Sequence, residues 1–169
     1  LSATVASAAV GTNKAVTVVV GATYLSGLDL ANYQLPTIAG SPVVDITRAN
    51  QAALSITSLS STTYGQDLTL SSTGGTGAGA TTYAVDSGPC TVSGTTLSPT
   101  AAGTCAITAT KAQDSTYLAT TSSYSVTVNY ATQSTVIVTN ATTVVYGSTL
   151  ALSASGGSGS GAFEFATTS

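Results

Sequence analysis

Three residue types are missing from this sequence, and charge is scarce. The chain of 169 residues contains no His, Met or Trp, and only 5% of its residues are charged, against roughly 25% in typical globular proteins. Without His, neither a Ser/His/Asp nor a Cys/His catalytic arrangement can form. A pair of catalytic carboxylates would require two scattered acids, such as Asp67 and Asp86, to meet in the fold. We therefore expect no enzyme and no catalytic residues.

The shortage of cations and of long apolar runs excludes two further classes. The basic residues are Lys14, Arg48 and Lys111, and nucleic-acid binding requires several such side chains to neutralise phosphates. The apolar run at 15–20 is far shorter than the roughly 20 residues of a membrane helix. We expect no nucleic-acid partner and no membrane insertion. The chain begins without Met or a signal peptide, so we expect a mature segment or a fragment whose targeting information lies elsewhere.

Apolar residues are abundant and regularly placed. They make up 43% of the chain and alternate with Thr and Ser. This alternation is typical of strands with one apolar face and one hydroxyl face, and no stretch has helical periodicity over three turns. The sequence predicts an all-β protein.

One long stretch of the sequence occurs twice. Tyr64-Gly65 returns as Tyr146-Gly147, and the correspondence holds without a gap from 51–87 to 133–169. We call the constant difference in residue number between matched positions the repeat offset. It is the difference between Gly65 and Gly147. Of the 37 aligned positions, 14 are identical, which indicates a tandem domain.

The repeat divides the chain into three parts. We expect a complete central module at 51–132. A front segment at 1–50 corresponds to the later part of a related module, and a tail segment at 133–169 to the first part of another.

Short strands separated by Gly and Pro turns are expected throughout the central module, the pattern of an Ig-like β-sandwich. The seven expected strands are 54–57, 67–71, 82–85, 91–92, 96–98, 105–110 and 122–129. In the front segment we expect strands at 14–20 and 41–47. There, 28–35 corresponds to 113–118, and 43–47 to 125–129. The predicted fold is thus a string of tandem Ig-like β-sandwich modules, one complete and two partial.

Two short polar joints connect the modules: a first joint at 48–51 and a second joint at 130–133. Such joints are too short to act as free linkers, so we expect neighbouring modules to be held end to end. Two interpretations of the partial modules stay open. Either the sequence is a window of a longer array, or the tail of one copy completes the head of the next by strand complementation.

Cys90 and Cys105 both lie in the central module, and they are the two Cys of the sequence. A Cys pair in a small, charge-poor, strand-rich module indicates a disulfide. A metal site would need more ligands than two Cys without His, and a redox-active pair would need a nearby cation.

A Gly-rich stretch follows the second expected strand, at Gly74, Gly75, Gly77 and Gly79. A nucleotide-binding loop would need a helix after it, whereas strand residues follow here. We predict a structural turn or bulge between two strands.

Calcium and carbohydrate are the two ligands that stay open. Calcium would bind through carboxylates near the joints, where Asp45 and Asp114 lie, although no acidic cluster is present; otherwise we expect no metal and no cofactor. Tyr64, Tyr83 and Tyr124 are expected in the core or at corners rather than on a carbohydrate-binding surface.

The motifs together resemble a known family. Tyr-Gly, Gly-Gly-x-Gly-x-Gly, Gly-Pro-Cys and Gly-Thr-Cys make the central module similar to bacterial Ig-like repeats of giant surface adhesins, of the mostly-β, glycine-rich type. The front segment, with Leu-Ser-Gly-Leu-Asp-Leu-Ala-Asn-Tyr-Gln-Leu, resembles the end of a Tyr-Asp-Gly repeat. The resemblance implies an exported structural protein at the bacterial cell surface or in an extracellular matrix.

From these patterns we expect a structural repeat segment of an adhesin stalk or extracellular fibre. Its partners would be copies of itself or neighbouring modules of the same chain. The alternative is an adhesin module that binds a host or cell-surface carbohydrate, which an exposed aromatic cluster with convergent polar groups would favour.

Overall fold

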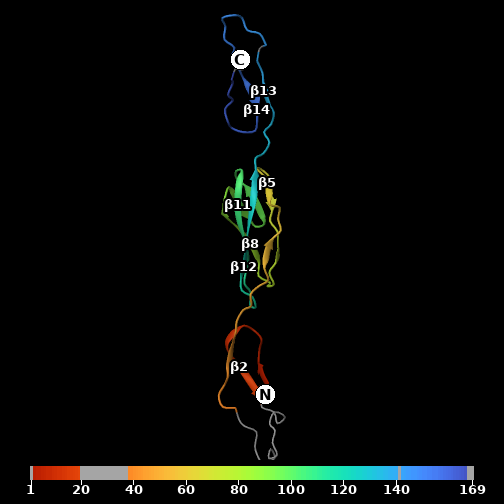
Figure 1. Ribbon diagram of the computed structural model, residues 1–169, viewed down its shortest axis with the longest axis vertical. Helices are drawn as coiled ribbons and strands as arrows, with labels where there is room; N and C mark the ends of the chain where they lie inside the picture. The colour runs from red at the N-terminus through yellow and green to blue at the C-terminus, as the bar shows by residue number, and fades with distance from the viewer. Residues whose placement is uncertain (1, 20–37, 141, 167–169) are drawn as a thin grey trace, which may run out of the picture.

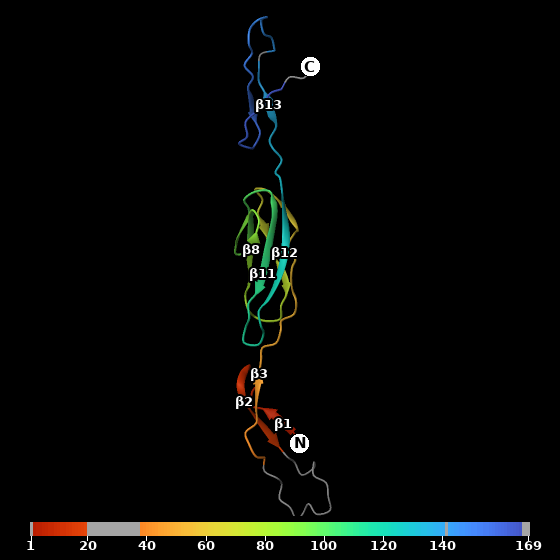
Figure 2. The ribbon, with the colours of Figure 1, turned by 60° about the vertical axis from the view of Figure 1, so that its left-hand side comes forward.

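The regular elements of the described residues are all β-strands. The computed structural model describes residues 2–19, 38–140 and 142–166. Residues 28–35, which we expect to correspond to 113–118, lie outside the described residues. The strands form three groups that follow one another along a long axis, with the central module in the middle (Figures 1 and 2). No helix in the part of the chain that the structure describes is long and apolar enough to cross a membrane.

The front segment forms one antiparallel sheet in the order β1-β2-β3. Its strands are β1 (Ser2–Val5), β2 (Gly11–Val19) and β3 (Val43–Ile46). The register of β2 against β3 shifts between Gly11 and Lys14. Asn13 lies in this shift with a φ of 51°, as expected for the extra residue of a β-bulge.

The central module contains nine strands in three sheets. One sheet has the order β5-β12-β11-β8, a second has the order β6-β10-β9, and β4 pairs with β7. The bounds are β4 (Leu54–Ile56), β5 (Ser61–Thr63), β6 (Leu68–Thr69), β7 (Ser72–Gly74), β8 (Thr81–Ser87), β9 (Cys90–Ser93), β10 (Thr96–Pro99), β11 (Gly103–Lys111) and β12 (Thr120–Asn129). All pairings are antiparallel except β5 with β12, which is parallel.

The sheets of the central module bury one shared core. Leu97 of β10 packs with Ile107 of β11 and Val126 of β12, and none of the three is exposed to solvent. Since β10 belongs to one sheet and β11 and β12 to another, the two sheets face each other, the arrangement of a β-sandwich. A smaller cluster joins Leu54 and Ile56 of β4 to Ala109 of β11.

The period-2 pattern of the sequence explains which residues enter this core. Along β11, the buried residues Cys105, Ile107 and Ala109 alternate with less buried neighbours, as a pleated strand requires. Tyr83 and Tyr124, expected in the core, pack against both clusters. Tyr64, expected in the core or at a corner, lies outside the core, in the turn that follows β5, and its side chain is half exposed.

The tail segment forms a hairpin of β13 (Val136–Val138) and β14 (Ala154–Gly156). Val136 pairs with Gly156 and Val138 with Ala154. Their counterparts at the repeat offset are in β4 and β7, where Leu54 pairs with Gly74 and Ile56 with Ser72. The tail segment therefore has the same strand register as the first strand pair of the central module, β4 with β7.

The front sheet matches another part of the central module. Its order β1-β2-β3 corresponds to β8-β11-β12, and all these neighbours are antiparallel. Gly11 opposes Ile46 in the front sheet, as Gly103 opposes Val128 in the central module. Ile46 and Val128 are themselves separated by the repeat offset. The front sheet thus has the strand arrangement of a module's closing half.

Candidate functional site: the joints between modules

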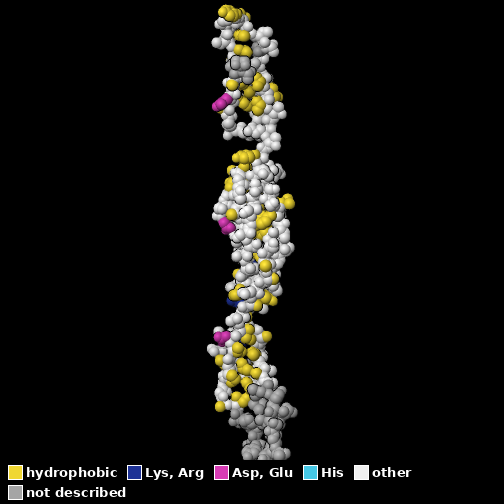
Figure 3. All heavy atoms as spheres, in the orientation of Figure 1, with side chains coloured by type: hydrophobic (Ala, Val, Ile, Leu, Met, Phe, Trp, Pro, Cys, Tyr) yellow, Lys and Arg dark blue, Asp and Glu magenta, His cyan; other side chains and the backbone are white. Residues whose placement is uncertain are grey.

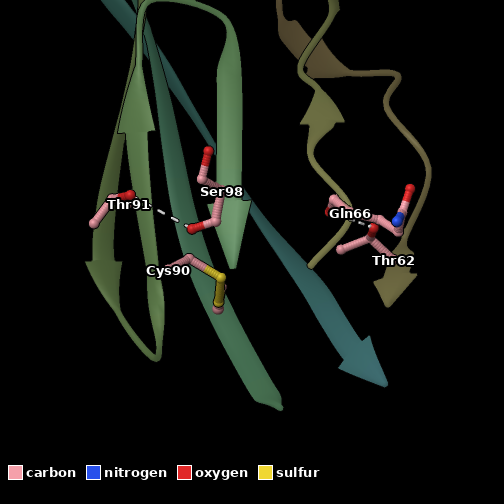
Figure 4. Close-up of a disulfide and its surroundings, with 6 residues drawn as sticks. Thr62, Gln66, Cys90, Thr91 and Ser98 are labelled. Atoms are coloured by element: carbon pink, nitrogen blue, oxygen red, sulfur yellow. Dashed lines mark hydrogen bonds between the residues drawn. A yellow bond between two sulfur atoms is a disulfide. The ribbon is translucent and has the colours of Figure 1, made fainter. Parts of the chain in front are cut away.

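The disulfide connects the two facing sheets of the central module. Cys90 lies in β9 and Cys105 in β11, with their Cα atoms 6.1 Å apart and their sulfur atoms bonded. Both residues are buried in the main core cluster. Figure 4 shows the bridge beside Thr91, whose hydroxyl donates to the carbonyl oxygen of Ser98 on β10 at 3.5 Å. The bridge therefore fixes β9 of one sheet to β11 of the other.

The Gly-rich stretch is a structural turn that brings the chain against the first joint. Gly74 ends β7 with a φ of 90°, and Gly75 follows with 69°, values that favour glycine. A Cβ atom at Gly74 would overlap the carbonyl oxygen of Ala53, and one at Gly79 the carbonyl oxygen of Ala112. These two glycines are therefore required by close backbone approach.

Gln51 ties three segments together at the first joint. Its Nε2 donates to the carbonyl oxygens of Ala112 at 3.0 Å and Leu118 at 2.8 Å. Its Oε1 accepts the backbone N–H of Gly77 at 3.2 Å. One side chain thus joins the end of the first joint to the β11–β12 loop and to the Gly-rich turn.

Asp114, which lies in the β11–β12 loop, hydrogen-bonds to backbone groups of that loop and of the Gly-rich turn. Its Oδ1 accepts the backbone N–H groups of Thr116 and Tyr117 at 2.7 and 2.8 Å, and its Oδ2 accepts that of Ala78 at 2.7 Å. These hydrogen bonds, that of Thr116 first, hold the pKa of Asp114 below its ordinary value, and the Coulombic attraction of Arg48 adds to them. The carboxylate is the form that these donors stabilise.

The backbone of the first joint also pairs with the β11–β12 loop. The N–H of Ala49 donates to the carbonyl oxygen of Thr116, and the N–H of Leu118 donates to that of Ala49, both at 2.9 Å. The Nε of Arg48 donates to the carbonyl oxygen of Asp114 at 2.8 Å. The chain leaving the front sheet is therefore hydrogen-bonded to the central module before its first strand begins.

The second joint repeats part of this arrangement. The N–H of Ser134 donates to the hydroxyl of Ser158 at 3.1 Å, as the N–H of Ala52 donates to that of Thr76 at 3.0 Å. A Cβ at Gly159 would lie 3.4 Å from the side-chain amide nitrogen of Gln133. The Gln133 side chain thus lies beside its Gly-rich turn, as Gln51 lies beside the turn at the first joint.

A shallow hollow of about 370 Å³ lies at the second joint. Two exposed tyrosines line it: Tyr64, which follows β5, and Tyr130, which is 89% exposed. Gln133 and Ser158 also line it. Exposed aromatic side chains beside polar residues are the feature on which the alternative, carbohydrate-binding interpretation depends.

Three of the four acids considered for calcium or catalysis, Asp45, Asp86 and Asp114, have hydrogen-bond partners within the fold. Oδ1 of Asp45 accepts the N–H of Asn13 at 2.8 Å, and Oδ2 of Asp86 accepts the hydroxyl of Thr108 at 2.7 Å. Among the described residues, no three His, Cys, Asp or Glu side chains gather into a possible metal site. The structure brings Asp114 to the first joint as a hydrogen-bond acceptor for backbone groups.

Sequence reasoning missed Gln51 as a functional residue. Its signal was present, because the repeat begins at Gln51 and again at Gln133. A polar residue at the start of both copies indicates a role in the joint that precedes each module.

Comparison with family models, with curated proteins and with solved structures finds no match to this chain.

Proposed function

We propose that the chain is a structural repeat segment of an exported bacterial surface protein, used in an adhesin stalk or an extracellular fibre. The resemblance to bacterial Ig-like adhesin repeats suggests this role. The observation that carries it is the first joint, where backbone and side-chain hydrogen bonds from Arg48, Ala49 and Gln51 attach one module to the next. A stalk needs this property, since its modules must transmit force without folding back on one another.

The central module supports an Ig-like assignment within this proposal. Its opening strand is divided between two sheets, because β4 pairs with β7 while β5 pairs in parallel with the last strand, β12. A disulfide joins the facing sheets, as in many Ig domains. Disulfides persist in oxidising compartments, which supports placing the segment outside the cytoplasm.

The test combines shape and location. Small-angle X-ray scattering of the purified chain is expected to give the distance distribution of a rod, and antibodies against the central module are expected to label unpermeabilised cells. A compact or broadly bent distribution would contradict the stalk. Labelling only after permeabilisation would contradict the surface location.

The second candidate function is carbohydrate binding at the hollow between Tyr64 and Tyr130. Exposed aromatic faces stack on sugar rings, and nearby polar groups fix their orientation. Screening the chain on a glycan array tests this directly. Binding that is lost in Tyr130→Ala would support it, and an array without signal would reject it.

A further inference from the structure

The disulfide of the central module is enclosed by the core. Cys90 is 8% exposed and Cys105 is fully buried, and both belong to the cluster that contains Leu97 and Ile107. On the face that Figure 3 shows, mostly polar side chains and backbone cover this module. A thiol must reach a sulfur atom in order to cleave the bond, and the packed sheets restrict that approach.

The backbone beside the bridge is closely packed as well. The carbonyl oxygen of Pro89 accepts the N–H of Thr100 at 2.8 Å. Gly88, with a φ of 101°, lies against the backbone of Thr104 and Cys105, and a Cβ atom at Gly88 would overlap the Thr104 carbonyl oxygen. The chain that enters β9 is therefore held against the chain that enters β11, and access to the bridge requires these contacts to break.

The bridge closes a chain loop that a pulling force would bypass. Cys90 and Cys105 are 15 residues apart in the sequence, and β9 and β10 lie between them. The chain enters the module before β4 and leaves it after β12, so a force along the chain is applied outside this loop. Once the sheets separate, the S–S bond passes the force directly from one cysteine to the other, and the residues between them stay unextended.

The closed loop stores chain length. An extended chain spans at most about 3.3–3.6 Å per residue, so the 15 residues of the loop can reach about 50 Å. The bridge holds the two Cα atoms 6.1 Å apart. Cleavage of the bond would therefore lengthen a stretched module by about 45 Å.

We propose that the bridge is a thiol-reactive site that tension exposes. In the folded module the core shields the sulfur atoms. When a force separates the facing sheets, a low-molecular-weight thiol can cleave the bond and release the stored length. This inference rests on the proposed function, since a stalk is what places the module under tension.

The reaction is thiol–disulfide exchange. The thiolate of the small thiol attacks one sulfur of the bridge, forms a mixed disulfide with it and expels the other sulfur as a thiolate, which takes a proton from water. A second molecule of the thiol then attacks the mixed disulfide. Two small thiols are thereby oxidised to their disulfide, and Cys90 and Cys105 are both reduced.

The first experiment stretches the full chain, tethered at both ends, at constant force with and without reduced glutathione. Without the thiol, the unfolding of the central module should end at a fixed length. With the thiol, a further step of about 45 Å at full extension should follow unfolding, at a rate proportional to the thiol concentration. The control, Cys90→Ala with Cys105→Ala, should show one longer unfolding step and no step that depends on the thiol.

The second experiment measures the shielding without force. The folded chain and the chain unfolded in guanidinium are incubated with reduced glutathione at the same pH, and the free thiols are alkylated and counted by mass spectrometry. Reduction should be at least about a hundredfold slower in the folded chain, because the bridge opens only with the module.

A matched pair of variants tests the packing beside the bridge. Gly88→Ala and Gly94→Ala both place alanine at a positive φ, 101° and 61°, but a Cβ at Gly94 has no atom within 4 Å. The folded Gly88→Ala chain should be reduced at least about tenfold faster than the folded Gly94→Ala chain. Equal rates would contradict shielding by this packing.

Two results would overturn the proposal as a whole. One is a thiol-dependent step that precedes unfolding, or a folded chain that is reduced as fast as the unfolded chain, since the bridge would then be open without tension. The other is the absence of any further step in the unfolded, bridged chain. Neither result affects the scattering shape or the surface labelling, which test the proposed function independently.

Discussion

Leu54 and Val136 occupy the same place in the repeat and differ in their burial. Each is the first residue of a three-residue strand, and each opposes a glycine across the pair, Gly74 or Gly156. Leu54 is 7% exposed, and Val136 is 47% exposed. The difference arises because β11 covers Leu54, whereas among the described residues only β14 pairs with β13. The strand pairing is therefore the same in both copies, whereas burial depends on contact with the second half of the module.

Removal of the disulfide should destabilise the central module without changing its fold. Cys90→Ala with Cys105→Ala releases a loop whose closure contributes about 3 kcal/mol in the chain-entropy model. Chemical denaturation of the double variant, compared with the oxidised parent, measures the loss. The reduced and alkylated parent should show a similar loss. An unchanged midpoint would contradict the role of the bridge.

Loss of the Gln51 side chain should loosen the first joint. Gln51→Ala removes donors to Ala112 and Leu118 and the acceptor for Gly77, at about 1 kcal/mol per hydrogen bond. Hydrogen exchange at the Leu118 amide should then be roughly tenfold faster or more. The matched control is Gln113→Ala, which changes an exposed glutamine of the same loop. Equal exchange rates in the two variants would contradict the assignment.

Acid should release the β11–β12 loop through Asp114. Its pKa is lowered in the folded state, so its stabilising effect is complete above its unfolded pKa of about 4. The effect is lost as the pH falls through the lower folded pKa. The protection of the Ala78 and Thr116 amides against hydrogen exchange, relative to their intrinsic rates at each pH, should therefore fall below about pH 4.

The variant Asp114→Asn should remove this dependence on pH and raise exchange at neutral pH. Asp67→Asn provides the control for a general loss of negative charge. An acid response that persists unchanged in Asp114→Asn would assign it to other groups.

Gly74 should tolerate substitution less well than Gly65. Both have positive φ, 90° and 84°, so alanine at either position costs about 1–2 kcal/mol in backbone conformation. A Cβ at Gly65 has no atom within 4 Å, whereas one at Gly74 overlaps the Ala53 carbonyl oxygen. Thermal unfolding should therefore show a several-fold larger loss for Gly74→Ala, and equal losses would contradict the close approach.

Side-chain patterns made the central strands predictable. β8, β11 and β12 alternate apolar and hydroxyl residues, and the expected ranges fall within their bounds. The chain has two Cys, so the pairing of Cys90 with Cys105 needed no choice between alternatives. The boundaries of the front segment, the central module and the tail segment remain a prediction that is based on the sequence repeat.

The sequence did not predict strands that lack apolar side chains and are stabilised by backbone pairing. β5 contains Ser61, Thr62 and Thr63, without an apolar residue, and it pairs only along the edge of its sheet. The expected strand at 67–71 is interrupted instead. The N–H of Leu70 donates to the carbonyl oxygen of Thr95, but the N–H of Ser71 donates to the hydroxyl of Ser58. Neither the polar strand β5 nor the interruption of the expected strand at 67–71 produces an alternating pattern in the sequence.

The parallel pairing of β5 with β12 determines how the central module meets tension. Chain segments that run in the same direction and are pulled from opposite poles slide along each other, in shear. The hydrogen bonds between them, including Thr127 N–H to Ser60 and Tyr64 N–H to Asn129, each at 2.9 Å, then bear the load simultaneously. A hairpin pulled from its open end breaks one bond at a time, like a zipper. The pair at the edge of the sandwich therefore acts as a clamp that must rupture as a unit before the module can extend.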